Sequence, residues 1–103
     1  MPDQRAKKGV PQRMLRITVD QQGDPIILKV EGKLSGPWVK ELERCWQSTR
    51  RKCAGRRLRV ELSDVGFVED RGRVLLREML HSGDELAASG PMMKSILEEI
   101  AAG

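Results

Sequence analysis

The pattern of hydrophobic and polar positions first indicates two short strands near the start of the chain. Residues 15–19, LRITV, alternate apolar and polar side chains, and residues 26–30, IILKV, form a second apolar run. Alternation with a period of two is typical of a strand with one buried face. Gly23 and Asp24 lie in the short turn between the two runs, which favours an antiparallel hairpin.

Three later stretches place their apolar residues at helical spacing. The first spans about residues 37–51, begins with a proline after a glycine, and gathers its apolar residues on one face. The second spans about residues 70–82, and its apolar positions, Val74 among them, cover well over half of the circumference, so we expect deep packing. In the third, near the C-terminus, adjacent apolar pairs such as Met92-Met93 recur every four residues and predict a core-facing stripe.

Two further strands separate these helices. Residues 57–62, RLRVEL, alternate cleanly, and residues 85–89 form a short run between the second and third helices. The resulting order is β-β-α-β-α-β-α. Strands that alternate with helices favour a mostly parallel sheet, to which the opening hairpin adds an antiparallel pair. We therefore expect an α/β fold in which helices pack against a four-stranded mixed sheet.

The composition fits one domain of this kind. The chain has 103 residues, of which 39% are hydrophobic and 33% charged, which is enough for one modest core under a solvated surface. Residues 1–13 are polar and basic with two prolines, so we expect a disordered arm before a single domain over residues 14–103. We find no segment fit to span a bilayer and no secretory signal, and we expect a cytoplasmic protein without membrane insertion.

Groups that commonly carry catalysis are sparse in this sequence. The single histidine, His81, lies near the end of a predicted helix, and no motif ties a nucleophile or an acid to it. Cys45 and Cys53 are separated by roughly 12 Å of helical rise, which is too far for a disulfide. With His81 they form no metal-ligand pattern. We therefore expect a protein that is not an enzyme and holds no metal or cofactor.

Two charged stretches have both a structural and a functional interpretation. The acidic pair Glu69-Asp70 lies at the start of the second predicted helix, where capping of the helix explains it better than acid–base catalysis. A basic run over residues 50–59 begins at the end of the first helix, where cations complement the helix dipole. No aromatic residue is interleaved with it, which disfavours nucleic acid. A basic adaptor for nucleic acid or another polyanion, using this run and the N-terminal arm, remains the alternative function.

Four stretches, in this order, resemble the STAS domain, which is shared by sulphate-transporter tails and anti-sigma factor antagonists. They are VEGKLS at 30–35, LRVELSDV at 58–65, FVEDRGRVLL at 67–76 and ASGP at 88–91. The third is similar to the family stretch in which Asp, two Ser or Thr residues and Gly open the second helix. The resemblance covers roughly residues 14–101, and it implies a STAS-like fold and a non-catalytic binding module.

In that family a partner kinase, itself an anti-sigma factor, phosphorylates a Ser or Thr just before the glycine, and the added charge breaks the interface. By position, Glu69 stands where the family has Asp, Asp70 stands at the first Ser, and Arg71 stands at the phospho-acceptor. Gly72 matches the family glycine. Arg71 cannot accept a phosphoryl group, so the resemblance implies the fold and the binding surface without the switch.

The resemblance thus implies a partner-binding surface in bacterial signalling regulation. Its residues are Glu69, Asp70, Arg71, Gly72 and Arg73. The implied partner is a protein, either an anti-sigma factor or kinase or a transporter component. Because the chain ends after the third predicted helix, we also expect a short sheet with an exposed edge, which a partner or a second copy of the chain can cover to form a homodimer.

Overall fold

The computed structural model describes residues 15–102, and its elements follow the predicted order. They are β1 (Arg16–Asp20), β2 (Ile26–Leu34), α1 (Pro37–Arg51), β3 (Leu58–Val68), α2 (Asp70–His81), β4 (Glu85–Ala87) and α3 (Pro91–Ala102). The arm predicted over residues 1–13 lies outside the described residues. Between residues 15 and 102, no helix has the length and apolar character needed to cross a membrane.

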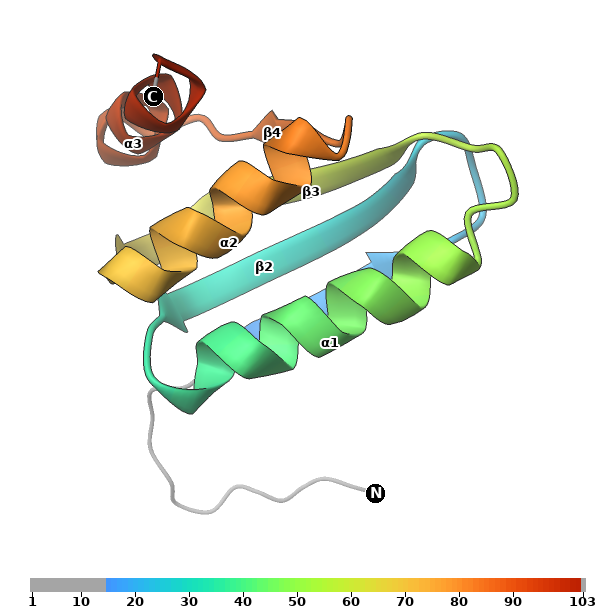
Figure 1. The fold of residues 1–103 in the computed structure, drawn as a ribbon, viewed down its shortest axis with the longest axis horizontal. Coiled ribbons are helices and arrows are strands. Elements are labelled where there is room, and N and C mark those ends of the chain that lie inside the picture. Colours follow the sequence, from blue (N-terminus) through green and yellow to red (C-terminus); the bar gives the residue numbers. More distant parts are fainter. Residues whose placement is uncertain (1–14, 103) are drawn as a thin grey trace.

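The four strands form one mixed sheet in the order β1-β2-β3-β4. β1 and β2 pair antiparallel, whereas β2 with β3 and β3 with β4 pair parallel. α1 and α2 lie side by side over one face of the sheet, and α3 packs beside α2 and β3 (Figure 1). The predicted α/β class, element order and mixed sheet are therefore confirmed.

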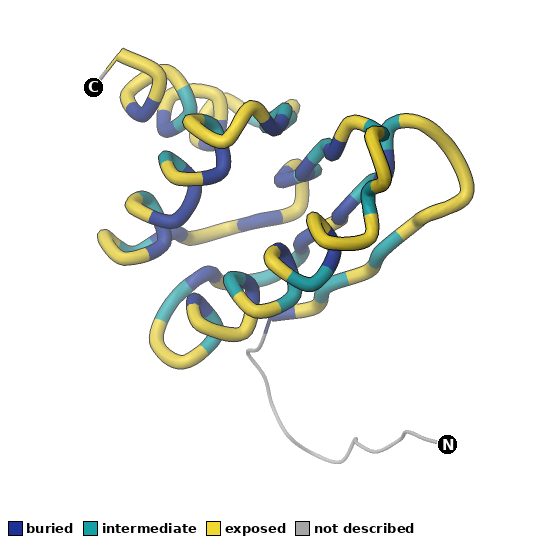
Figure 2. The backbone as a smooth tube through the Cα atoms, turned by 45° about the vertical axis from the view of Figure 1, so that its right-hand side comes forward, coloured by how far each residue is buried: buried dark blue, intermediate teal, exposed yellow. Residues whose placement is uncertain are grey.

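Burial along the strands shows which face of the sheet carries the core. In β2, Ile26, Leu28 and Val30 are fully buried, while Lys29 between them is exposed. The same alternation continues in β3, so the two central strands bury the face that α1 and α2 cover (Figure 2). The opposite face carries charged side chains such as Lys29 and Asp64, whose Nζ and Oδ2 atoms lie 3.8 Å apart.

β2 and β3 are both longer than the strands predicted at 26–30 and 57–62. Their pairing continues to the partners Leu34 and Val68, but the register shifts twice on the way. One shift lies next to Gly32, which has a φ of 109°, a backbone conformation that glycine adopts readily. Each shift interrupts the period of two, which is why alternation alone ended these strands too early. β4 is shorter than predicted and ends at Ala87.

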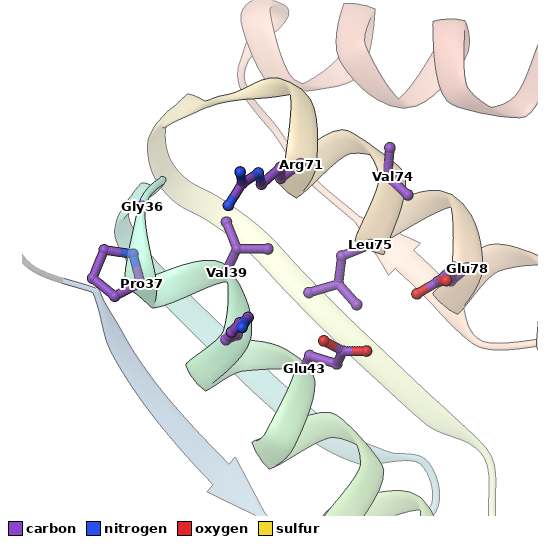
Figure 3. Close-up of a pocket in the computed structure, with 9 residues that line it drawn as sticks. Gly36, Pro37, Val39, Glu43, Arg71, Val74, Leu75 and Glu78 are labelled. Atoms are coloured by element: carbon purple, nitrogen blue, oxygen red, sulfur yellow. The ribbon is translucent and has the colours of Figure 1, made fainter.

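Two helical residues predicted to lie in the core are instead exposed. Val74 on α2 is 54% exposed and Met92 on α3 is 45% exposed, whereas Met93 is buried. Each apolar pair of α3 therefore contributes one buried residue, Met93, Ile96 or Ile100, and the buried stripe is narrower than predicted. Val74 is one of the residues of α2 that line a groove between α1 and α2 (Figure 3).

Candidate functional site

The starts of α1 and α2 lie next to each other although they are far apart in the sequence. The Glu69 carboxylate oxygen Oε1 accepts a hydrogen bond from the backbone amide of Gly36, at 2.7 Å. The backbone amide of Glu69 donates to the carbonyl oxygen of Leu34, at 3.1 Å. Glu69 is the N-cap residue of α2, but its side chain caps no amide of that helix. The predicted capping by Glu69 is therefore wrong for α2, because the carboxylate satisfies the amide that opens α1.

Of the remaining residues of the predicted partner-binding surface, some are exposed and others are engaged in contacts within the domain. Asp70 and Arg71 are exposed in the first turn of α2. Gly72 is buried, and its lack of a side chain lets α2 approach β2 and β3 closely. Arg73 donates to the Glu99 carboxylate on α3, at 2.6 Å. Only Asp70 and Arg71 therefore present freely exposed charged side chains at this helix start.

An open groove runs between α1 and α2, with a volume of about 530 Å³. Its lining residues are Gly36, Pro37, Val39, Lys40, Glu43, Arg71, Val74, Leu75 and Glu78. Figure 3 shows Arg71 toward the end where α1 begins, and Glu43 and Glu78 toward the other end. Val39 and Leu75 are buried beneath it and Val74 stands exposed beside it. The groove therefore has an apolar floor, Arg71 at one end, Glu43 and Glu78 at the other, and Lys40 on its α1 wall.

The charged side chains of the groove have no ion-pair partner within the part of the chain that the structure describes. Among residues 15–102, neither Lys40, Glu43, Arg71 nor Glu78 takes part in an ion pair. Sequence patterns did not identify this groove, because Val74 carries the same apolar signal as the buried residues around it. The distance between α1 and α2 determines whether Val74 is exposed, and the periodicity of the sequence does not predict that distance.

The basic run over residues 50–59 is held largely by contacts within the domain. Arg50 pairs with Asp84, with Nη1 and Oδ1 3.0 Å apart, and Arg59 donates to Glu85 at 2.9 Å. The Nη1 atom of Arg57 lies 3.5 Å from Oε2 of Glu85. Arg56 donates to the backbone carbonyl oxygens of Gln21 and Gly23, in the turn between β1 and β2. These cations therefore serve several separate structural contacts and form no single free basic surface.

Asp84, between α2 and β4, is a buried polar side chain with 8% exposure. Its Oδ2 atom accepts a hydrogen bond from the indole Nε1–H of Trp46 on α1, at 2.6 Å. Arg50 pairs with its other oxygen and lies 5.8 Å from the centre of the Trp46 ring. This cluster joins the second half of α1 to the loop before β4. The sequence reasoning missed it, because a lone aspartate after a glycine gives the same signal as an ordinary turn.

The two cysteines do not line the groove, whereas His81 lies with Glu43 and Glu78 around a second hollow at its acidic end. Cys45 and Cys53 are free thiols, as predicted, and His81 is exposed at the end of α2. Burial raises the pKa of the Cys45 thiol, and a hydrogen bond with Thr49 partly offsets this effect. Within residues 15–102, no three His, Cys, Asp or Glu side chains come together in a way that could hold a metal ion.

The described residues thus form a small α/β domain whose most distinctive surface is the groove beside the start of α2. No model of a known protein family matches the chain, and no curated protein matches it either.

Proposed function

We propose that this chain is a STAS-like, non-catalytic protein-interaction module that works without the usual phospho-switch. The observation that carries the proposal is the position of Arg71, next to the exposed Asp70, at one end of a groove whose other end carries Glu43 and Glu78. The order of helices and strands agrees with the one that the resemblance implies. The proposed partner is an anti-sigma factor or related kinase, or a transporter component, met in the cytoplasm.

The groove has the character of a surface that receives part of another protein. Val74 exposes apolar area beside the groove, and apolar area that is rimmed by polar residues commonly marks an interaction site. Helices with one apolar face bind grooves of this type. The opposite charges at the two ends favour one orientation of the bound segment, because reversal places like charges together. A partner segment with an acidic residue toward Arg71 and a basic residue toward Glu43 and Glu78 fits this arrangement.

Arg71 supports a surface that phosphorylation does not control. Its guanidinium group is a permanent cation with hydrogen-bond donors only, so it can pair with a partner carboxylate in a fixed geometry. Asp70 adds a fixed negative charge one position earlier. A phosphorylated Ser or Thr at position 71 would carry negative charge, whereas the positive charge of Arg71 is permanent. Incubation with family-type kinases should leave residues 69–73 unmodified, and a phosphopeptide from this stretch would contradict the alignment.

A quantitative pull-down tests the proposed surface. The tagged chain and two variants, D70K/R71E and V74D, are compared in extracts of the source cells by mass spectrometry. The matched control is R44E, because Arg44 is exposed on α1 and, within residues 15–102, pairs with the neighbouring Glu41 alone. We expect at least one protein to be captured by the natural chain and by R44E and to be lost with both groove variants. Equal capture by all four proteins would rule out this surface.

A further inference from the structure

β1 forms one edge of the sheet, and within residues 15–102 no strand pairs with its outer side. The sheet order is β1-β2-β3-β4, and β1 pairs only with β2. The opposite edge is formed by the short strand β4, and α3 packs against β3 on that side of the domain. Unpaired edge strands are templates for pairing with another chain. β1 is therefore the edge that a further strand can extend most readily.

The sequence of β1, RITVD, is complementary to itself when two copies run antiparallel. When the two-fold axis passes through Thr18, Arg16 of each copy faces Asp20 of the other. Ile17 of each copy then faces Val19 of the other. Opposite charges and apolar pairs directly across an antiparallel ladder are stabilising. A register shifted by one residue in either direction removes both charge pairs and sets Asp20 against an apolar side chain, Leu15 or Ile17, which selects the symmetric register.

We propose that β1 is a homodimerisation strand, and that two copies of the chain join their four-stranded sheets antiparallel at β1. The occupant of this edge is a second copy because its charges and apolar residues complement those of β1 at every position of the symmetric register. A two-fold contact of this type is closed, since the same surface of both copies is used and no further copy can add to it. The dimer therefore removes the free edge without forming a fibre.

Apolar side chains beside β1 support a second copy as the partner. Ile17 and Val19 pack against the core but are only half-buried. On α1, Trp38 and Cys45 are also half-buried. Helical spacing places them on the flank of α1 away from Glu43, which lines the groove toward α2. A second copy at β1 covers apolar area that a single copy leaves partly in water.

The proposed dimer leaves the α1/α2 groove accessible. The groove lies between α1 and α2, whereas the dimer contact lies at the β1 edge of the sheet, away from α2, which packs on β3 and β4 (Figure 1). Each dimer then carries two grooves, so a partner with two binding segments gains avidity from linked contacts. Dimerisation does not depend on the proposed function, because it uses none of the residues of the groove.

Complementary charge variants test the pairing in solution. In D20R, Arg16 of one copy faces an arginine of the other, and in R16D, Asp20 faces an aspartate. We expect each variant alone to dissociate at a concentration about tenfold higher than the natural chain. An equimolar mixture should restore association, because both ends of the strand are again oppositely charged. Sedimentation velocity over a concentration series measures this, and circular dichroism checks that each variant is folded.

Disulfide trapping tests the register directly. The cysteine variants are made in a full chain that also carries C45A and C53A. In the proposed dimer, the T18C thiols of the two copies lie opposite each other, at a separation that suits a disulfide. R16C and D20C should form little cross-link alone but should cross-link with each other when mixed under copper-catalysed air oxidation. K94C, on the exposed part of α3, reports random collision.

The outcomes separate this dimer from the alternatives. Cross-linking of T18C and of the R16C–D20C mixture, above the level of K94C, supports the dimer at β1. A natural chain that stays monomeric at all concentrations overturns it, and so does cross-linking of R16C alone at the level of the mixture. The groove variant V74D should dimerise normally, so a failure of partner capture and a failure of dimerisation are distinguishable.

Discussion

The Glu69 carboxylate and the backbone amide of Gly36 lie 2.7 Å apart and hold the first turns of α1 and α2 together. Gly36 is the N-cap residue of α1 and has no side chain with which to cap that helix. An acidic residue from the start of one helix therefore satisfies a backbone amide at the start of the other. This contact joins the two helix starts at the end of the groove that Gly36 and Arg71 line.

Replacement of Glu69 by alanine should destabilise the domain and loosen the groove. The amide of Gly36 loses its acceptor, and we expect the free energy of unfolding to fall by about 1 kcal/mol, since the site is only partly buried. E69Q keeps an oxygen acceptor and should lose less. The control is E98A, because Glu98 is exposed on α3. Urea unfolding measures the difference, and an equal effect of E69A and E98A would contradict the structural role of this bond.

Gly72 should not tolerate even a methyl group. A Cβ atom there would lie 2.9 Å from Cγ1 of Val68 and 3.0 Å from Cγ of Leu34. Alanine normally favours a helix over glycine by about 1 kcal/mol, but overpacking a close contact costs about 1–3 kcal/mol. We expect G72A to lower the midpoint of urea unfolding.

The matched control for this prediction is G66A, on β3. No heavy atom lies within 4 Å of the position that a Cβ atom would take at Gly66. The free energy of unfolding should therefore change by no more than about 0.5 kcal/mol. A G72A protein as stable as G66A would show that α2 does not need this close approach to the sheet.

Asp84 should contribute more to stability than any exposed ion pair of the domain. In D84A the Trp46 indole loses its hydrogen-bond acceptor and Arg50 loses its ion-pair partner, so we expect a loss of about 2–3 kcal/mol. D84N keeps an oxygen for Trp46 and should lose less. The control is E41A, which removes an exposed pair with Arg44 and should cost less than about 1 kcal/mol. Similar losses in D84A and E41A, measured by thermal unfolding, would contradict this ranking.

The order of helices and strands was predictable because it depends on local periods. Residues 37–51 form α1 as predicted, and α2 ends one residue before the predicted end at 82. The extension of β2 and β3 was not predictable from alternation, since the register shifts near Gly32 depend on pairing between the two strands. Local patterns therefore identified each element, and tertiary pairing decided how far each strand extends.

The candidate site was predictable only in part, because the groove depends on tertiary packing. The helix start at Asp70 and Arg71 can be read from the sequence, and both side chains are exposed there. The groove cannot be read in the same way, because Val74 and Leu75 are neighbours of similar character, and only the packing of α1 against α2 exposes one and buries the other. The bond between Glu69 and Gly36 likewise joins residues that only the folded sheet brings together.

The stability of the domain should depend on pH through Cys45. Burial raises the pKa of this thiol in the folded state, so the folded protein holds the thiol proton more tightly than the unfolded chain does. The contribution is fully present below the ordinary thiol pKa of about 8.5, and it is lost as the pH rises above that value. The natural chain should therefore lose stability relative to C45A between about pH 8 and pH 10.

Urea unfolding of the reduced protein at several pH values measures this difference. C53A, which retains Cys45, should show the same loss as the natural chain. A constant difference between the natural chain and C45A across this range would show that the Cys45 proton is held no more tightly in the folded state.

Binding to nucleic acid should be weak, because most of the basic run is already engaged. Arg50 pairs with Asp84, and Arg57 and Arg59 both approach Glu85. A polyanion would have to replace these contacts. Fluorescence anisotropy with a labelled oligonucleotide at about 50 mM salt should show no saturable binding, whereas a phosphate-binding protein would bind there and lose affinity steeply with added salt.

Two charge variants make the polyanion test decisive. R51E/K52E reverses the exposed cations that follow Arg50, and R5Q/K7Q/K8Q/R13Q neutralises the basic residues before β1. Saturable binding that one of these variants abolishes would establish the basic-adaptor function. Loss with R51E/K52E would place binding on the basic run, and loss with R5Q/K7Q/K8Q/R13Q would place it on the N-terminal residues. Because neither variant changes the groove, both should still capture the protein partner. Loss of partner capture with R51E/K52E would instead place the interaction surface at the C-terminal end of α1.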